Sequence, residues 1–390
     1  MGGFYERSDP PLPDPRRPKF PYRQGFSVSI HSHVPPPPFG VCYPDGPDRD
    51  GSIIDPEELG FNRTDWCLKN PPAEAPDHLE ECSEEDCKNN ADSDDDAEAV
   101  PHPDADDSVH NLHVLDEIAC KDGRGAQVVR CYLDKDEDKV LVAKIYDALY
   151  YHHGRDVTYH ADYDYRREAA AYEDMKKKGI DGTLVPKYYG SWTFDAPLLG
   201  SPPTTRPVRM ILMEWIEGVS MDSAVVNGHL NGLYEPIPPQ QRLNILAKAM
   251  EIDTTLWHHG IRHRDLAPRN IMLVGENMDI KIPRVVLVDF NQAVCLNRLG
   301  KPRVTKKLPV SPRYRYWNDR GEFIPWLPEP HRSDYKVFNG WLKVTWKHSK
   351  DFGPFTTSWK DFNANYKIRP PLPDAEVSDT KPSDVSTESE

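Results

Sequence analysis

A short polar run followed by an apolar strand is the feature that most constrains how this chain folds. The run His263 to Asn270 places Asp265 and Asn270 five residues apart in a loop. Nineteen residues after Asn270, the apolar stretch 285–288 ends in Asp289. Carboxylate and amide oxygens in such loops can orient a hydroxyl and hold Mg²⁺ against phosphates, which is most of what phosphoryl transfer requires of a protein. The pattern predicts a fold that gathers these oxygens around one cation.

Charge is distributed unevenly along the 390 residues, whose net charge is −15. Residues 1–110 carry 25 acidic and 9 basic side chains, a balance of −16, so the remainder is close to neutral. A near-neutral globular region lacks the basic footprint of a nucleic-acid binder. With no secretory signal and no apolar run long enough to span a membrane, we expect a soluble, intracellular protein with no membrane or nucleic-acid partner.

The two ends of the chain have the composition of unpacked segments. Residues 1–110 are proline-rich and then acidic, and residues 369–390 are polar. Such segments bury too little apolar surface to offset the entropy of ordering them. We expect a disordered arm and a disordered tail, with short docked pieces around 53–54 and Trp66. The arm is a candidate docking site for a partner.

Between the two ends, strands come first and helices later. The pattern predicts strands at 113–119, 126–133, 140–146, 185–192 and 208–215, a helix at 163–178, a loop at 194–207, and a helix that opens at Pro238–Pro239 and stops at Gly260. We therefore predict an α+β fold with two lobes. The small, β-rich N-lobe spans 111–217, and a shortened helical C-lobe spans 218–368.

The spacing of Asp265, Asn270 and Asp289 resembles the catalytic and magnesium loops of the protein-kinase-like superfamily. The segments 309–317 and 326–329 resemble divergent kinase-like proteins of filamentous fungi, and the likeness covers about 112–345. The resemblance implies a kinase-like fold, ATP and Mg²⁺ as cofactors, and transfer of the γ-phosphate to a hydroxyl, with a protein substrate as the leading acceptor.

The resemblance also implies roles for individual residues. Asp265 would orient the acceptor hydroxyl, and Asn270 and Asp289 would coordinate magnesium. Lys144, which is costly inside its apolar strand without a partner, would contact the phosphates and pair with Glu168, with Glu173 as the alternative. Arg269, four residues after Asp265, resembles the arrangement in tyrosine kinases.

A second group of residues would form the nucleotide pocket. It comprises the glycine-loop positions Gly123, Gly125 and Val128, the strand residue Ala143, and the hinge positions Met213, Glu214 and Ile216. The loop departs from the family pattern, because Lys121 and Ala126 stand at the outer two glycine places. The magnesium loop departs too, with Asn291 in place of glycine.

Two other functions stay open. A small-molecule kinase of the aminoglycoside- or choline-kinase type uses a similar set of Asp, Asn and Asp, and the short C-lobe favours it. A pseudokinase scaffold, with the N-terminal arm as a docking tail, is favoured by the weak glycine loop.

Overall fold

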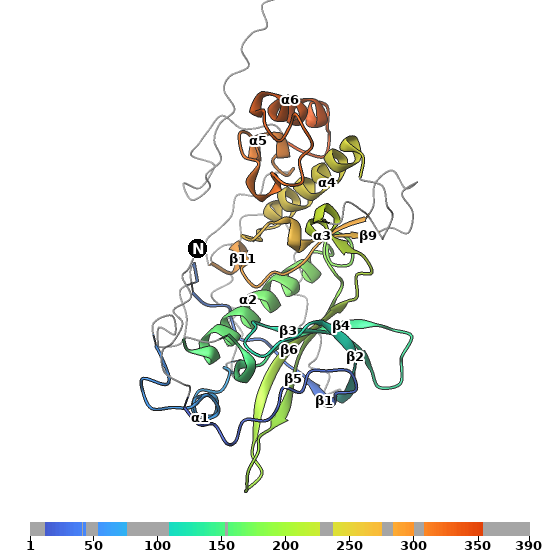
Figure 1. Cartoon of the computed structure of the whole chain (residues 1–390). Coiled ribbons are helices and arrows are strands. Elements are labelled where there is room, and N and C mark those ends of the chain that lie inside the picture. Colours follow the sequence, from blue (N-terminus) through green and yellow to red (C-terminus); the bar gives the residue numbers. More distant parts are fainter. Residues whose placement is uncertain are drawn as a thin grey trace, which may run out of the picture.

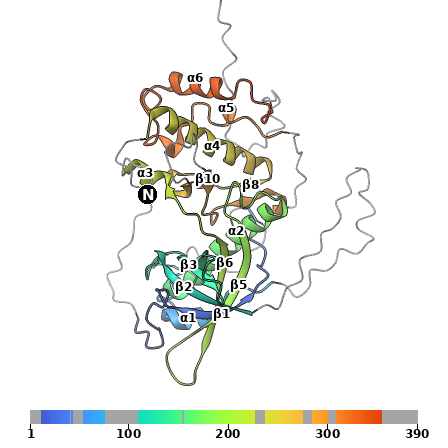
Figure 2. The same cartoon turned by 90° about the vertical axis from the view of Figure 1, so that its right-hand side faces the viewer.

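The structure is a computed structural model that describes residues 12–40, 42–43, 54–75, 109–152, 155–226, 237–274, 284–299 and 308–353. Its strands and helices separate in space. A β-rich part lies at one end and a mainly helical part at the other, with helix α2 (Val157–Lys177) between them in both views (Figures 1 and 2). The α+β character predicted from the sequence is confirmed.

The β-rich part is a closed barrel of six antiparallel strands in the order β1-β2-β3-β4-β6-β5. The strands are β1 (Ser27–Ser32), β2 (Val109–Ala119), β3 (Gln127–Leu133), β4 (Leu141–Tyr146), β5 (Tyr188–Pro197) and β6 (Thr205–Glu214). Leu112, Val129 and Ile145 are among its buried residues. The barrel closes through a short pairing of β1 with β5, in which His31 and Ser32 lie opposite Thr193 and Trp192.

The five strands predicted between 113 and 215 are all present, but the predicted loop at 194–207 is wrong. Strands β5 and β6 run into this segment from both sides, and only 198–204 connects them. Gly200, Pro202 and Pro203 lie in that connection, but Pro207 lies within β6 opposite Asp195. Phe194 and Val208 are buried. Arg206, also buried, forms two hydrogen bonds with Asp147, so the strand extends to meet this partner.

The sixth strand comes from the arm that was expected to be disordered, so that expectation is wrong for the described part of the arm. Strand β1 pairs with both β2 and β5. Helix α1 (Arg63–Lys69) packs against α2, and its Trp66 donates to Asp156 Oδ1 at 2.8 Å. Tyr22 and Ile30 are fully buried. Composition averaged over 110 residues conceals these few anchoring side chains. The acidic run 84–96 and the tail 369–390 lie outside the described residues.

Helix α2 begins at a capping residue and ends after a basic turn. Asp156 accepts hydrogen bonds from the backbone N–H groups of Thr158 and Tyr159, which explains why the helix starts six residues before the predicted 163. Its small residues Ala169–Ala171 are buried. Small side chains let the helix lie close against both the barrel and the helical part.

The helical part is built on α4 (Pro239–His258), which begins and ends as predicted. Around it lie the helices α3 (Met221–Val226), α5 (Pro312–Arg315) and α6 (Tyr335–Trp346), with the short strands β7 (Val219–Ser220), β8 (Ile261–Arg262), β9 (Ile271–Val274), β10 (Arg284–Leu287) and β11 (Val294–Cys295). Asp253 of α4 accepts hydrogen bonds from Arg315 and Tyr316, which fixes α5. Among the described residues, no helix has the length and apolarity needed to cross a membrane.

His33 makes the packing of the N-terminal segment pH-dependent. Burial and the nearby Arg209 lower the pKa of His33 to about 4, although Glu74 opposes the shift. Between pH 6.5 and 4 the unfolded chain therefore binds a proton that the folded chain does not, so the free energy of unfolding falls as the pH falls. We expect this loss to reach about 3 kcal/mol.

The variant His33→Asn tests this expectation, because asparagine can keep a hydrogen bond to Tyr165 without titrating. Urea unfolding from pH 7 to pH 4 should show a shallower decline for the variant than for the wild type. Parallel pH profiles would contradict the assignment.

Candidate active site

Three charged side chains from separate elements meet at the junction of the barrel and the helical part. The ammonium of Lys144, on β4, lies 2.5 Å from Oε2 of Glu168, on α2. It also lies 2.7 Å from Oδ1 of Asp289, which follows β10. The sequence predicted the pairing of Lys144 with Glu168, and the structure brings these two side chains together.

Lys144 and Asp289 hold each other in their ionised forms, whereas burial acts against the charge on Glu168. Burial alone would lower the pKa of Lys144, but the carboxylates of Asp289 and Glu168 outweigh it and raise the pKa. The ammonium in turn lowers the pKa of Asp289. Glu168 is fully buried, and desolvation raises its pKa despite the ammonium. Opposite charge this close offsets the desolvation of Lys144 and Glu168, while the side chain of Asp289 stays partly exposed.

Glu168 is fixed by two further groups. Tyr146 donates its hydroxyl to Oε2 at 2.7 Å, and the backbone N–H of Phe290 donates to Oε1 at 3.2 Å. The alternative partner, Glu173, instead bonds Arg298 at 2.8 Å. Tyr146 was not anticipated; its place two residues after Lys144, on the same face of the strand, was the available signal.

The loop that carries Asp265 is closed by its own hydrogen bonds. Asn270 donates through Nδ2 to the backbone oxygen of Asp265 at 2.8 Å and to its Oδ2 at 2.9 Å. His263 Nδ1 accepts from the Asp265 N–H, so the other ring nitrogen donates to the carbonyl of Val288 at 2.9 Å. Burial lowers the pKa of His263, which favours this neutral form. The imidazole thus joins the loop to the strand end before Asp289.

Arg269 bridges the loop to the helical part. Its guanidinium lies 2.5 Å from Oδ1 of Asp265 and 2.8 Å from Oε2 of Glu322. Glu322, in the short turn Gly321–Phe323, was not anticipated, and no motif in the sequence marks it. Because Arg269 and Glu322 are both more than half exposed, water screens the pair, and it orients Arg269 more than it stabilises the fold.

The glycine loop joins β2 to β3 and is held mainly by other residue types. The N–H of Gly123 donates to the carbonyl of Tyr150 at 3.0 Å, with φ at +79°. The buried side chain of Gln127 bonds both main-chain groups of Lys121 and the carbonyl of Gly125. Gln127 therefore fixes the backbone of the loop, a role that the sequence pattern did not predict.

The loop has a second tether from the N-terminal segment. Arg17 bonds Asp122 at 2.6 Å and the carbonyl of Leu149 at 3.0 Å. A Cβ at Gly125 would meet no atom within 4 Å, so nothing in the fold requires glycine at that position.

The residues predicted to line the nucleotide pocket lie on both faces of the barrel strands. Val128 pairs directly with Lys144 across β3 and β4, and Met213 pairs with Val142 across β4 and β6. Directly paired residues share a face, whereas neighbours along a strand alternate. Ala143 therefore points away from Lys144, and its assignment to the pocket is wrong. Val142, two residues before Lys144, occupies the position that Ala143 was expected to fill.

The remaining two positions lie at the end of β6. Glu214 uses its carboxylate to bond Arg284 and the N–H of Lys187, and its own N–H donates to the carbonyl of Lys187 at 2.8 Å. Ile216 is buried. Met213 accepts a hydrogen bond from Tyr172 of α2 at 3.7 Å, which places it at the back of the same region.

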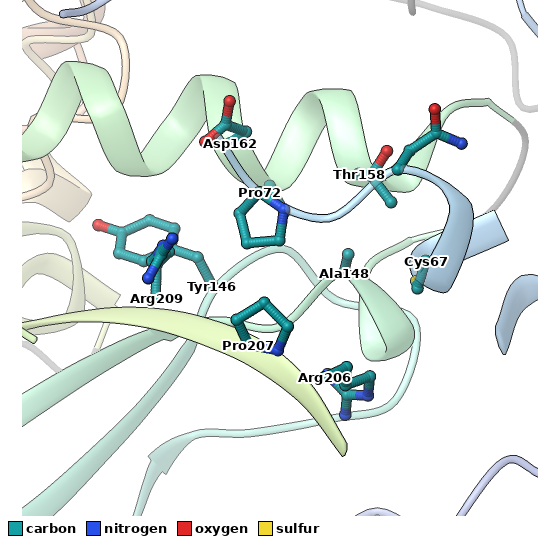
Figure 3. A pocket seen from close by; sticks show the side chains of 11 residues that line it. Cys67, Pro72, Tyr146, Ala148, Thr158, Asp162, Arg206, Pro207 and Arg209 are labelled. Carbon is teal, nitrogen blue, oxygen red and sulfur yellow. The ribbon is translucent and has the colours of Figure 1, made fainter. Parts of the chain in front are cut away.

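A small cavity lies elsewhere, and none of the predicted site residues lines it. It is enclosed by α2, β6 and the segment after α1 (Figure 3). Its two arginines already have partners, Arg206 with Asp147 and Arg209 with Glu74. The cavity is a packing gap behind α2.

Comparison with known proteins finds partial similarity to protein kinases. No family model matches the chain. Part of the chain is 36% identical over 84 residues to the serine/threonine-protein kinase PknB of Mycobacterium leprae, and 36% identical over 92 residues to PknB of Mycolicibacterium smegmatis. These stretches cover 20% and 23% of this chain. Over these stretches the chain is similar to serine/threonine-protein kinases.

The matched stretches cover only a small part of the length of these relatives. This chain spans 12% and 14% of the two PknB proteins, so their whole activity does not transfer to it. Among solved structures, the BubR1 kinase domain covers 48% of this chain at 13% identity, and the ROP18 kinase domain in complex with AMP-PNP and sucrose covers 49% at 18%. These superpositions cover 49% and 54% of the two domains, and both TM-scores are 0.34, too low to establish a shared fold. The closer likeness to fungal proteins stays a prediction.

Lys144 should stabilise the fold as well as the site. In Lys144→Met, Glu168 and Asp289 lose their shared cation. We expect the free energy of unfolding to fall by about 3 kcal/mol, because an uncompensated buried charge remains. Urea unfolding measures this loss, and Lys135→Met, at an exposed position, is the matched control. Equal stability of the two variants would show that the ion cluster contributes nothing.

Proposed function

We propose that the chain is a phosphotransferase that moves the γ-phosphate of Mg-ATP to a hydroxyl. The observation that carries the proposal is the bridging of Glu168 and Asp289 by Lys144, beside a loop in which Asn270 holds Asp265. A structural ion pair needs one carboxylate for one ammonium. The second carboxylate, on a separate element, is what a cation and phosphates would require. On this proposal the barrel and the helical part are the two lobes of a kinase-like fold.

Lys144 would bind the phosphates of the nucleotide. Glu168 holds the ammonium from one side, with Tyr146 and the Phe290 N–H fixing the carboxylate. An ammonium oriented in this way cannot swing toward water, so its charge is already directed when phosphate oxygens arrive.

Asn270 and Asp289 would hold magnesium, and their chemistry fits the ion. Asn270 donates through Nδ2, so its Oδ1 is the atom left to face a cation. Asp289 bonds Lys144 through Oδ1, which leaves Oδ2, and the ammonium keeps its pKa low. Magnesium commonly takes one or two protein oxygens plus phosphates and water. Bound magnesium would neutralise charge on the phosphates.

Asp265 would orient the acceptor hydroxyl and accept its proton. Asn270 and Arg269 each bond one of its carboxylate oxygens, which fixes the plane of the group. Arg269 would also place positive charge near the transferred phosphate. Ala267 stands where many serine/threonine kinases have lysine, so Arg269 supplies the cation on this side.

A protein hydroxyl is the acceptor we propose, and two alternatives remain with an observation behind each. A small-molecule acceptor is favoured by the helices that follow Asp289, which in the described residues are only α5 and α6. A scaffold without turnover is favoured by the glycine loop, which is ordered by Gln127 and Arg17 more than by glycine. The N-terminal arm would dock a partner in either case.

Two variants separate binding from turnover. Asp289→Asn should abolish magnesium-dependent phosphoryl transfer, because the amide cannot balance the charge of the cation. Asp265→Asn should keep Mg-ATP binding and lose about 10²- to 10⁴-fold in turnover, the usual contribution of a positioned base. Transfer from radiolabelled ATP to mixed protein acceptors, and separately to aminoglycosides and choline, reports the activity and the acceptor class.

The controls decide among the three functions. Asp319→Asn changes a carboxylate in the exposed turn before Glu322 and should leave activity unchanged. Transfer only to the small molecules would replace the proposed acceptor. Binding of Mg-ATP without transfer to any acceptor would favour the scaffold.

A further inference from the structure

We propose that Tyr43 and Arg167 form a positioning unit that fastens α2 to the segment after Asp289, so that the N-terminal segment sets how often Glu168 meets Lys144. Neither residue touches the nucleotide site directly. The catalytic consequence rests on the proposed function, whereas the fastening itself is a property of the fold. We call residues 33–40 and 42–43, which lie along α2, the strap.

Arg167 joins α2 to the backbone beyond Asp289. Its side chain is fully buried, next in sequence to Glu168. Through Nη2 it donates to the carbonyls of Gln292 and Ala293, both at 2.8 Å, and through Nη1 to the hydroxyl of Tyr163 at 2.5 Å. A buried guanidinium is tolerated only where such acceptors are fixed. The helical turn that carries Glu168 is therefore tied to the segment that carries Asp289.

Tyr43 completes this junction from the strap. Its hydroxyl accepts the backbone N–H of Cys295 at 2.7 Å, and its ring lies 5.8 Å from the guanidinium of Arg167. The ring is buried, which raises the pKa of Tyr43, so the hydroxyl is neutral at all ordinary pH values. Tyr43 thus contacts both partners that Arg167 joins, the helix and the segment after Asp289.

The rest of the strap covers the outer face of α2. Phe39 packs edge-on against Tyr159 and Tyr163, with ring centres 5.1 and 5.5 Å apart. Arg166 donates to the carbonyl of Pro37 at 2.7 Å. At Gly40, φ is +74° and a Cβ would lie 2.7 Å from the Tyr163 ring, so only glycine permits this approach. Outward movement of α2 would break all these contacts.

These contacts predict a particular kinetic signature. Loss of the Tyr43 hydroxyl would let α2 move outward in a fraction of molecules. ATP would then bind only to the molecules in which Glu168 still pairs with Lys144, which we call engaged. The apparent dissociation constant then rises as the inverse of the fraction of molecules that stay engaged. Saturating ATP restores the engaged state, so kcat is preserved. Replacement of Lys144 itself would lower kcat, because the interaction would be absent from the transition state as well.

Tyr43→Phe is the test variant, because it keeps the ring and removes only the acceptor. We expect faster hydrogen exchange at the amides of 167–174 in the nucleotide-free full chain. We also expect the KM for ATP to rise about three- to tenfold, with kcat within about twofold of wild type. The control is Tyr132→Phe, on β3, whose ring stacks on His113 at 4.9 Å, far from the strap in the barrel register. The control should change neither quantity.

Gly40→Ala provides a second variant that acts without touching Arg167 or Cys295. The added Cβ should displace the strap and shift both readouts in the same direction. Wild-type exchange and wild-type KM in Tyr43→Phe would overturn the proposal, as would a fall in kcat at unchanged KM. If the wild type does not bind Mg-ATP, the proposed function fails, and the exchange of α2, measured without nucleotide, still decides whether Tyr43 holds the helix.

Discussion

A buried ammonium between two carboxylates is the interaction on which the arrangement of this molecule depends. Lys144 belongs to the barrel, Glu168 to α2, and Asp289 to the strand end of the helical part. Removing such charges from water is costly, and the cost is met only if all three elements lie in register. The cluster therefore selects one relative placement of the three elements, and that placement creates the site.

Hydrogen bonds and one ring contact extend this order from the cluster to the loop of Asp265. Glu168 accepts from the N–H of Phe290, whose ring lies 4.7 Å from that of His263. His263 then bonds Val288 on one side and Asp265 on the other. The two groups proposed to act on phosphate and on hydroxyl are thus coupled through neutral, buried contacts. This coupling explains why a histidine in the loop braces the backbone instead of acting as a base.

Sequence reasoning identified what depends on local pattern and missed what depends on long-range closure. The strands and α4 could be predicted because the spacing of apolar residues is visible in a short stretch of sequence. The pairing of Lys144 with Glu168 could be predicted because a lysine in an apolar strand requires an acidic partner. Ala143 was misassigned because the face of a strand residue follows from the register with Lys144, which spacing alone did not fix. Strand β1 was missed because its partners, β2 and β5, lie far along the chain.

The most direct test of the central claim is covalent labelling with an acyl-phosphate derivative of ATP, which transfers its acyl group to an amine beside the phosphates. Mass spectrometry of the digested full chain identifies the modified residue. If the cluster is a nucleotide site, Lys144 is the labelled lysine, and excess Mg-ATP prevents the reaction. Labelling spread over exposed lysines and insensitive to Mg-ATP, with Lys144 unmodified, would contradict the account.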